Sequence, residues 1–312
     1  MLPAFQKLSE HKFMCAYIAP TGRVAELKDE IKKTIFEKDS FLLSDKPLRK
    51  SYWAQNIWQD IKVEKIESIK KAASFLESLQ RNWWHYPLSN VRRTKLIQEL
   101  LPRIKSRPLA FPFQIPQSPL GAFALLSENE LIYSAKCQSF MPNGEFVFAE
   151  PKYKVPSEAY TKLWEALVRM GEWPQPGDFC VDLGSCPGSW TQALLKLGAR
   201  VLSVDTAEIE LDPTRDLEFL KKDAFKLNPA EIKNPSWICS DIICYPDKLY
   251  TLAVEWRKAH PKANFIFTLK FQGKWDRVTV DRFRQIPNSQ VVHLFNNKHE
   301  LCWMSGPKIT QI

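Results

Sequence analysis

Residues 178–205 read DFCVDLGSCPGSWTQALLKLGARVLSVD, and their pattern specifies the fold of the second half of the chain. The apolar runs 179–183 and 200–204 have the length and composition of buried β-strands. Between them, a glycine turn leads into a helical pattern at 189–197, which Gly198 is placed to end. Strand, tight turn, helix and strand in this order predict the opening half of a doubly wound α/β sheet.

The glycine turn indicates a ligand that contains a nucleoside. Gly184 and Gly188 let the backbone approach a ligand where a Cβ would collide, and Pro187 stiffens the turn. The helix that follows points free N–H groups of its first turn at whatever lies there. Asp205 ends the second strand, where a carboxylate can accept hydrogen bonds from two ribose hydroxyls.

The spacing of the turn separates two classes of cofactor. A dinucleotide site uses G-x-G-x-x-G, in which the middle glycine makes room for a pyrophosphate. Here the spacing is G-x-x-x-G, and Ser185 or Cys186 stands at the middle position. S-adenosylmethionine (SAM) has no phosphate and tolerates this looser turn, so we favour SAM over a dinucleotide. An α/β domain with no nucleotide remains the third possibility.

Composition restricts the class of protein. The chain has 312 residues, enough for two domains, and a formal net charge of +9. That charge suits a polyanionic partner such as RNA, although a basic protein without such a partner fits equally well. No run of 18 apolar residues and no secretory signal are present. The seven cysteines form no C-x-x-C pair, which favours reduced thiols in a cytoplasmic protein over disulfides or a zinc site. We expect no metal.

The first half, residues 1–150, reads as a smaller α/β or α+β domain. Strands at 12–18 and 41–43 flank a helical pattern at 24–36, and a longer helical pattern covers 61–79. Prolines punctuate residues 102–119, which predicts an irregular linker or a strap across a surface.

A basic cluster is the best candidate in this half for contact with an RNA backbone. It lies in and after a predicted helix at 90–101, where Glu99 alone opposes it. A solvated helix face is an equally good interpretation. The cluster consists of Arg92, Arg93, Lys95, Arg103, Lys105 and Arg107.

The second domain, residues 151–312, continues the alternation of strands and helices. A helix capped by Ser157 should run through Met170 before the glycine turn. After the turn, the last two strands adjoin without a helix and should therefore pair antiparallel. This predicts a seven-stranded mixed sheet of the Rossmann-like methyltransferase kind. The expected strands after the turn are 200–205, 217–222, 236–240, 264–269, 290–295 and 299–304, and the helices are 246–259 and 278–285.

Charged residues stand at the carboxyl ends of the predicted strands, where open α/β sheets bind their ligands. Asp182 and Asp241 should face the middle of the crevice, and Asp223 suits the amino group of an adenine. Lys270 follows an unusually apolar run, FIFTLK. Because an unpaired buried ammonium is costly, we expect Lys270 to pair with Asp241.

The half from Ser157 to Pro307 resembles the FtsJ-like RNA ribose 2′-O-methyltransferases, which carry a Lys-Asp-Lys-Glu tetrad. The matching segments are SEAYTKLWEA at 157–166, the loop from Asp182 to Trp190, ICSDI, FIFTLKF and KHELCWM. The resemblance implies that the catalytic residues are Lys162, Asp241, Lys270 and Glu300, hereafter the tetrad. It implies that SAM is bound by Asp182, Gly184, Ser185, Pro187, Gly188, Trp190, Asp205, Asp223 and Asp241.

Within the family, the chain is most similar to the RlmM-type branch, which methylates a cytidine ribose in large-subunit ribosomal RNA. The shared features are CPG-W-T in the loop, residues 146–152 and a long N-terminal region. In that branch the N-terminal part is a THUMP-containing RNA-binding module. Two residues depart from the family pattern, because Glu158 occupies the place of a usual arginine and Ser189 replaces the second glycine of the loop, and the chain is also shorter than is usual in the branch.

The resemblance leads to a hypothesis of mechanism and leaves alternatives. Lys270 would take the proton of the 2′-hydroxyl, Asp241 would orient the amine, and Glu300 would hold Lys162 or the ribose. The alternatives are a methyltransferase acting on another RNA or on a small molecule, and a non-catalytic SAM-binding factor in RNA binding or ribosome assembly. The departures Glu158 and Ser189 favour the last of these.

Overall fold

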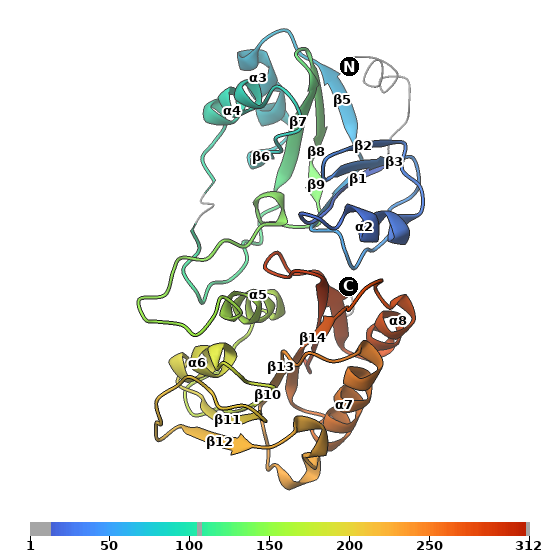
Figure 1. Cartoon of the computed structure of the whole chain (residues 1–312). Coiled ribbons are helices and arrows are strands. Elements are labelled where there is room, and N and C mark those ends of the chain that lie inside the picture. Colours follow the sequence, from blue (N-terminus) through green and yellow to red (C-terminus); the bar gives the residue numbers. More distant parts are fainter. Residues whose placement is uncertain (1–13, 105–107, 310–312) are drawn as a thin grey trace. The chain divides into compact units, whose positions relative to one another are not determined.

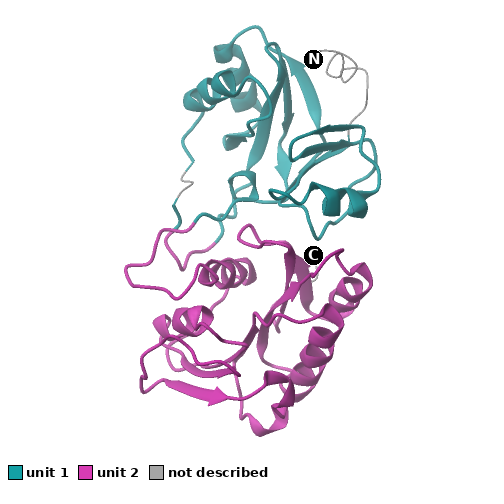
Figure 2. Ribbon diagram, viewed as in Figure 1, with its two compact units in different colours: residues 1–109, 115–147 teal, residues 110–114, 148–312 magenta. Residues whose placement is uncertain are grey.

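The computed structural model describes residues 14–104 and 108–309. The chain divides into two compact units (Figure 2). Unit 1 comprises residues 1–109 and 115–147, and unit 2 comprises residues 110–114 and 148–312. Within the described ranges, no helix is both long and apolar enough to cross a membrane.

Unit 1 contains two sheets, three α-helices and a short 3-10 helix (Pro142–Gly144) in its described residues (Figure 1). The five-stranded sheet has the order β2-β3-β1-β4-β9 and is antiparallel throughout. The four-stranded sheet has the order β5-β8-β7-β6, in which only β6 and β7 run parallel. The strands are β1 (Cys15–Ile18), β2 (Phe36–Lys38), β3 (Phe41–Ser44), β4 (Asn56–Gln59), β5 (Lys62–Lys65), β6 (Trp83–His85), β7 (Gly121–Ser127), β8 (Glu130–Ser134) and β9 (Lys136–Cys137). The helices are α2 (Val24–Ile31), α3 (Ile69–Leu79) and α4 (Val91–Leu100).

Two helices of unit 1 are shorter than their sequence patterns predict. The predicted helix 61–79 was wrong over its first part, because Lys62–Lys65 is strand β5, paired antiparallel with β8. Helix α3 begins only after Ser68, whose hydroxyl accepts a hydrogen bond from the backbone N–H of Lys71. The predicted helix 24–36 likewise ends at Ile31. In both places pairing with another strand overrides a local helical period.

Unit 2 is built on the seven-stranded mixed sheet that the sequence predicts, in the order β12-β11-β10-β13-β14-β16-β15 (Figure 1). Strand β16 alone runs antiparallel to its neighbours β14 and β15, so the predicted pairing of the last two strands is confirmed. The strands are β10 (Phe179–Leu183), β11 (Arg200–Asp205), β12 (Leu217–Lys221), β13 (Trp237–Ser240), β14 (Asn264–Lys270), β15 (Ser289–Val292) and β16 (Glu300–Ser305). The helices are α5 (Tyr160–Met170), α6 (Ser189–Lys196), α7 (Pro246–Ala259) and α8 (Arg277–Gln285).

Through helix α5, a residue of the proline-punctuated stretch packs against the core of unit 2. The ring of Phe111 stacks on Trp164 of α5, with centroids 4.6 Å apart and planes 6° from parallel. The ring of Phe148 meets Trp164 edge-on at 5.5 Å. These aromatic contacts fix one face of α5. The side chain of Lys162, on the same helix, is thereby held toward Asp241 at the carboxyl end of β13.

Candidate active site

A cavity of about 460 Å³ lies at the carboxyl ends of β10, β11, β13 and β14. Among the SAM-binding residues that the sequence predicts, all except Gly188 line it. Lys270 of the tetrad lines the cavity as well. Ligand sites in open α/β sheets occupy this position, because the strand order reverses there.

The glycines of the loop after β10 allow close packing beside the cavity. Gly184 has a φ of +76°, and a Cβ built on it would lie 2.1 Å from Cγ1 of Ile242. Gly188 has a φ of +111°, and its Cβ would lie 2.9 Å from Cγ of Leu211. A side chain at Gly184 would therefore clash with the loop after β13. Gly188 shapes the turn from outside the cavity lining, where it precedes α6.

The strand-end carboxylates Asp205 and Asp223 are oriented by backbone donors. Asp205 accepts the N–H of Cys186 on Oδ2 and the N–H of Ala207 on Oδ1, both at 2.9 Å. Asp223 accepts the N–H of Phe225 on Oδ1 at 3.0 Å. A carboxylate offers about four lone-pair sites, so each retains acceptor capacity toward the cavity. This fits a ligand that presents hydroxyl and amino donors.

Asp182 lies beneath the loop and is 1% exposed. It accepts a hydrogen bond from Oγ1 of Thr191 at 2.6 Å. Burial raises the pKa of Asp182 to about 7, the hydrogen bonds from Thr191 oppose the rise, and the charges of Asp241 and Asp205 add to it. Asp182 therefore carries a proton over part of the neutral pH range.

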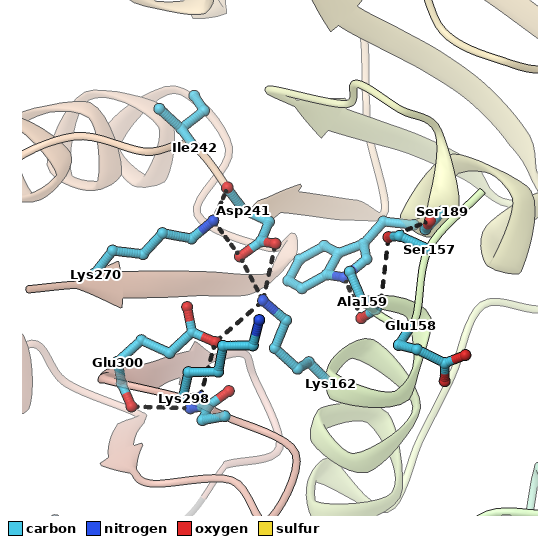
Figure 3. A network of polar contacts seen from close by, with 12 residues as sticks. Ser157, Glu158, Ala159, Lys162, Ser189, Asp241, Ile242, Lys270, Lys298 and Glu300 are labelled. Carbon is cyan, nitrogen blue, oxygen red and sulfur yellow. Dashed lines mark hydrogen bonds and ion pairs between the residues drawn. The ribbon is translucent and has the colours of Figure 1, made fainter. Parts of the chain in front are cut away.

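The tetrad forms one continuous network (Figure 3). Nζ of Lys162 donates to Oδ1 and Oδ2 of Asp241 at 3.1 and 2.9 Å and to Oε1 of Glu300 at 3.1 Å. Nζ of Lys270 donates to the carbonyl oxygen of Asp241 at 2.6 Å and lies 3.1 Å from its Oδ1. The predicted pairing of Lys270 with Asp241 is thus confirmed. Lys270 and Glu300 also oppose each other in the register of β14 and β16.

The two lysines of the tetrad have different environments. Burial alone would lower the pKa of Lys162, but the carboxylates of Asp241 and Glu300 outweigh it and raise the pKa. The side chain of Lys162 is 11% exposed and that of Lys270 is 19% exposed. Lys270, but not Lys162, lines the cavity. Lys162 is therefore a fixed cation behind Asp241, whereas Lys270 is the amine that a ligand can reach.

Glu165 of α5 is a residue that the sequence reasoning missed. Its side chain is fully buried, and it accepts the N–H of Phe295 at 2.9 Å and the N–H of Asn296 at 3.3 Å. Arg169 pairs with it at 2.8 Å. Glu165 thereby fastens the loop before β16, which leads to Glu300, onto the helix that carries Lys162. An acid on the apolar face of the predicted helix was the available signal.

The two departures from the family pattern do not disturb the network. Helix α5 begins at Tyr160, so the prediction that Ser157 caps it was wrong. Oγ of Ser157 instead lies 2.8 Å from Oγ of Ser189, a hydrogen bond that a glycine at this position could not form. Glu158 is exposed and points away from the tetrad (Figure 3).

The basic cluster belongs to unit 1 and is not part of this network. Arg92 and Lys95 are exposed on α4, Arg93 is half-buried there, and Arg103 is exposed beyond the helix. Lys105 and Arg107 lie outside the described residues. Arg92, Lys95 and Arg103 form no ion pair with any side chain in residues 14–104 or 108–309.

Comparison with known proteins places this site in context. "Ribosomal RNA large subunit methyltransferase M" of Photobacterium profundum is 32% identical over 182 residues, which are 51% of this chain and 50% of that protein. The protein of that name from Shigella flexneri is 34% identical over 144 residues, 42% and 39% of the two chains. The chain thus spans about half the length of the curated relatives it matches.

Solved structures are more distant. The fibrillarin pre-rRNA processing protein of Methanococcus jannaschii covers 50% of this chain and 82% of its own at 12% identity, with a TM-score of 0.37. The description "FtsJ-like methyltransferase" fits residues 155–310, half of the chain, a range that includes the cavity and the whole tetrad. On that match, the chain belongs to the FtsJ-like methyltransferase family.

Proposed function

We propose that this protein transfers a methyl group from SAM to a ribose 2′-hydroxyl of RNA, and that the target is a cytidine of large-subunit ribosomal RNA. The observation that carries the proposal is the network of Lys162, Asp241, Lys270 and Glu300 beside the cavity. The names of the relatives support ribosomal RNA as the substrate.

As a member of this methyltransferase family, the chain takes SAM as its cofactor. The cavity fits it, because Asp205 and Asp223 in its lining offer acceptors for ribose hydroxyls and an amino group. When bound, SAM supplies an electrophilic methyl group. The residues of the loop after β10 that line the cavity, such as Gly184 and Ser185, would hold its nucleoside.

The tetrad residues supply orientation and proton transfer. The 2′-oxygen must lie in line with the bond to be broken, and such positioning contributes up to about 7–11 kcal/mol in ideal cases. Lys270 faces the cavity and, in its unprotonated form, takes the 2′ proton to become an ammonium, because a neutral hydroxyl is a poor nucleophile. Asp241 holds that amine through its carbonyl and its carboxylate. Lys162 holds Asp241 in place, and Glu300 holds Lys162.

RNA binding is shared with unit 1 in this proposal. The exposed cations Arg92, Lys95 and Arg103 contact the RNA backbone, which makes binding depend on salt. Replacing Arg92 and Lys95 with alanine should reduce the slope of log affinity against log salt by about 0.7–0.9 for each lost phosphate contact. An unchanged slope would remove these residues from the RNA interface. In this proposal we place the protein in the cytoplasm.

The primary test is a map of ribose methylation in RNA from cells with and without this protein. We expect one cytidine of the large-subunit RNA to lose its mark in the deletion strain. Purified protein should restore it in vitro, and Lys270→Ala should fail. Lys262→Ala is a matched control, because Lys262 is exposed before the opposite end of the same strand, β14.

The outcomes separate the proposal from its rival. Wild-type rates in a single-turnover assay of Lys270→Ala would end the role given to Lys270. An unchanged methylation map, together with calorimetric binding of SAM, would favour the non-catalytic assembly factor. The structure gives that rival no support from Ser189 or Glu158, since the first forms a hydrogen bond and the second points away from the tetrad.

A further inference from the structure

The segment between β13 and α7 carries a catalytic residue and two outward-facing apolar side chains. Asp241 begins the segment and is held by Lys270 through its carbonyl oxygen. Ile242 packs against Gly184, so it faces inward. Ile243 and Tyr245 are 74% and 64% exposed. Two large apolar groups therefore emerge within four positions of Asp241.

Tyr245 is unusual among the aromatic residues. In residues 14–104 and 108–309, it is the one aromatic side chain among the exposed large hydrophobic residues, and the others are buried or half-buried. A single exposed apolar residue needs no explanation by its exposure alone. Tyr245 lies four positions after Asp241 in the chain, and that position and the lysines near the segment supply the further observations.

Ile243 and Tyr245 differ in their relation to the cavity. Ile243 lines it, so a bound ligand would cover this side chain. Tyr245 is not among the lining residues, and a ligand inside the cavity leaves it exposed. Its backbone is fixed, because Tyr245 precedes Pro246 at the start of α7 and its carbonyl oxygen accepts the N–H of Leu249 at 3.1 Å. The ring is therefore presented from a rigid position.

Two cations flank the segment. Lys270 donates to the carbonyl oxygen of Asp241, and Lys248 lies three positions after Tyr245 in the first turn of α7. Nζ of Lys248 also lies 3.8 Å from the centroid of the Phe225 ring, which lines the cavity. An exposed aromatic ring in a segment that has one lysine at its start and another just after it fits a nucleotide, which combines an aromatic base with a phosphate.

We propose that Tyr245 is a stacking surface for a nucleobase of the RNA at the methylation site, with Lys248 beside the adjoining phosphate. The inference rests on the proposed function and adds a recognition element to it. A ribose whose 2′-oxygen reaches Lys270 carries its base and phosphates beyond the cavity, and the proposal places one of these bases on Tyr245. The base is that of the methylated nucleotide or of an immediate neighbour, and the test below distinguishes them.

The test compares Tyr245→Ala, Tyr245→Phe and the wild type. The probe is a fragment of large-subunit RNA that spans the mapped position, with binding and methyl transfer measured at saturating SAM. Tyr245→Ala should weaken RNA binding by about 5- to 150-fold, the range for one lost base–aromatic stack. Tyr245→Phe should stay within about twofold of the wild type, because stacking needs the ring and not the hydroxyl. The control Val254→Ala changes an exposed apolar residue of α7, the helix that follows Tyr245, and should change nothing.

A second arm identifies the base. The fragment is made with an abasic residue at the target position or at either neighbour, and the loss caused by Tyr245→Ala should vanish on one of these RNAs. The calorimetric affinity for SAM should be equal in all proteins, which shows that the variants are folded. Equal RNA binding by Tyr245→Ala and wild type would overturn the inference, as would a loss that persists on every abasic RNA. Methyl transfer by none of the proteins would instead overturn the proposed function.

Discussion

Lys162 bridges two carboxylates from opposite sides of the site, with Nζ 2.9 Å from Oδ2 of Asp241 and 3.1 Å from Oε1 of Glu300. The helix α5, the loop after β13 and the start of β16 are thus joined by one ammonium group. Because the three side chains are only 9–17% exposed, the bridge is shielded from water. Lys162 should therefore contribute to stability as well as to the proposed catalysis.

Replacing Lys162 with methionine should lower both methyl transfer and the free energy of unfolding. Two carboxylates would be left close together without their cation, and the loss of one partner of a buried ion pair costs about 3–5 kcal/mol. Some exposure of Asp241 places the expected loss near the lower value. Urea denaturation measures it. The double variant Lys162→Met/Glu300→Gln should recover part of the stability but no activity, and equal stability of wild type and Lys162→Met would contradict the argument.

Asp182 should make stability fall as the pH rises. Its pKa is about 7 in the folded protein, above the ordinary value of 3.8, so the folded state holds a proton that the unfolded state releases. The contribution is complete below about pH 4 and is lost as the pH rises to 7. Between pH 5 and 7 the change should be up to about 3 kcal/mol. Unfolding of wild type and Asp182→Asn without SAM, compared across this range, measures it.

The comparison of wild type with Asp182→Asn needs a control variant in which an exposed carboxylate is replaced in the same way. Asp212→Asn removes an exposed acid of the same unit and should reproduce the wild-type dependence on pH. Asp182→Asn should flatten the dependence, because the amide has no proton to release in this range. A parallel pH profile for wild type and Asp182→Asn would show that Asp182 is ionised throughout.

The hydrogen bond between Ser157 and Ser189 predicts a coupling between the segment before α5 and the start of α6. Removing either hydroxyl should cost about 1 kcal/mol of unfolding free energy, and removing both should cost little more. The cycle uses Ser157→Ala, Ser189→Ala and the double variant, and their interaction energy should be about 1 kcal/mol. Strictly additive losses would mean that the two hydroxyls do not act together. Ser189→Gly should retain methyl transfer, since it restores the glycine that the family usually carries.

The parallel part of the fold could be predicted because each strand carries its own signal. Apolar runs that end in a charged residue, such as the run before Lys270, mark both the strand and the edge at which the site lies. Strand β5 could not be predicted in this way, because its partner β8 is distant in sequence and alternation over four residues is a weak pattern. Local periodicity then favoured a helix that the structure does not have.

The tetrad could be predicted from the sequence, whereas the contacts of Glu165 and Ser157 could not. Lys162, Asp241, Lys270 and Glu300 follow from a resemblance that carries their positions as a set. Glu165 depends on backbone groups 130 and 131 positions further along the chain, and no local pattern announces such donors. A helix cap was inferred for Ser157 from its place before an apolar run, whereas its hydroxyl meets the start of another helix.

The contact of Phe111 with Trp164 has a consequence for dissecting the protein. Unit 2 takes residues 110–114 from the proline-punctuated stretch, although residues 115–147 return to unit 1. The backbone consequently passes between the units three times, and no single cleavage separates them. A fragment that begins at residue 148 would omit the ring stacked on Trp164, two positions after Lys162. The match to the family covers one continuous stretch, residues 155–310, but the folded unit that contains this stretch also includes residues 110–114.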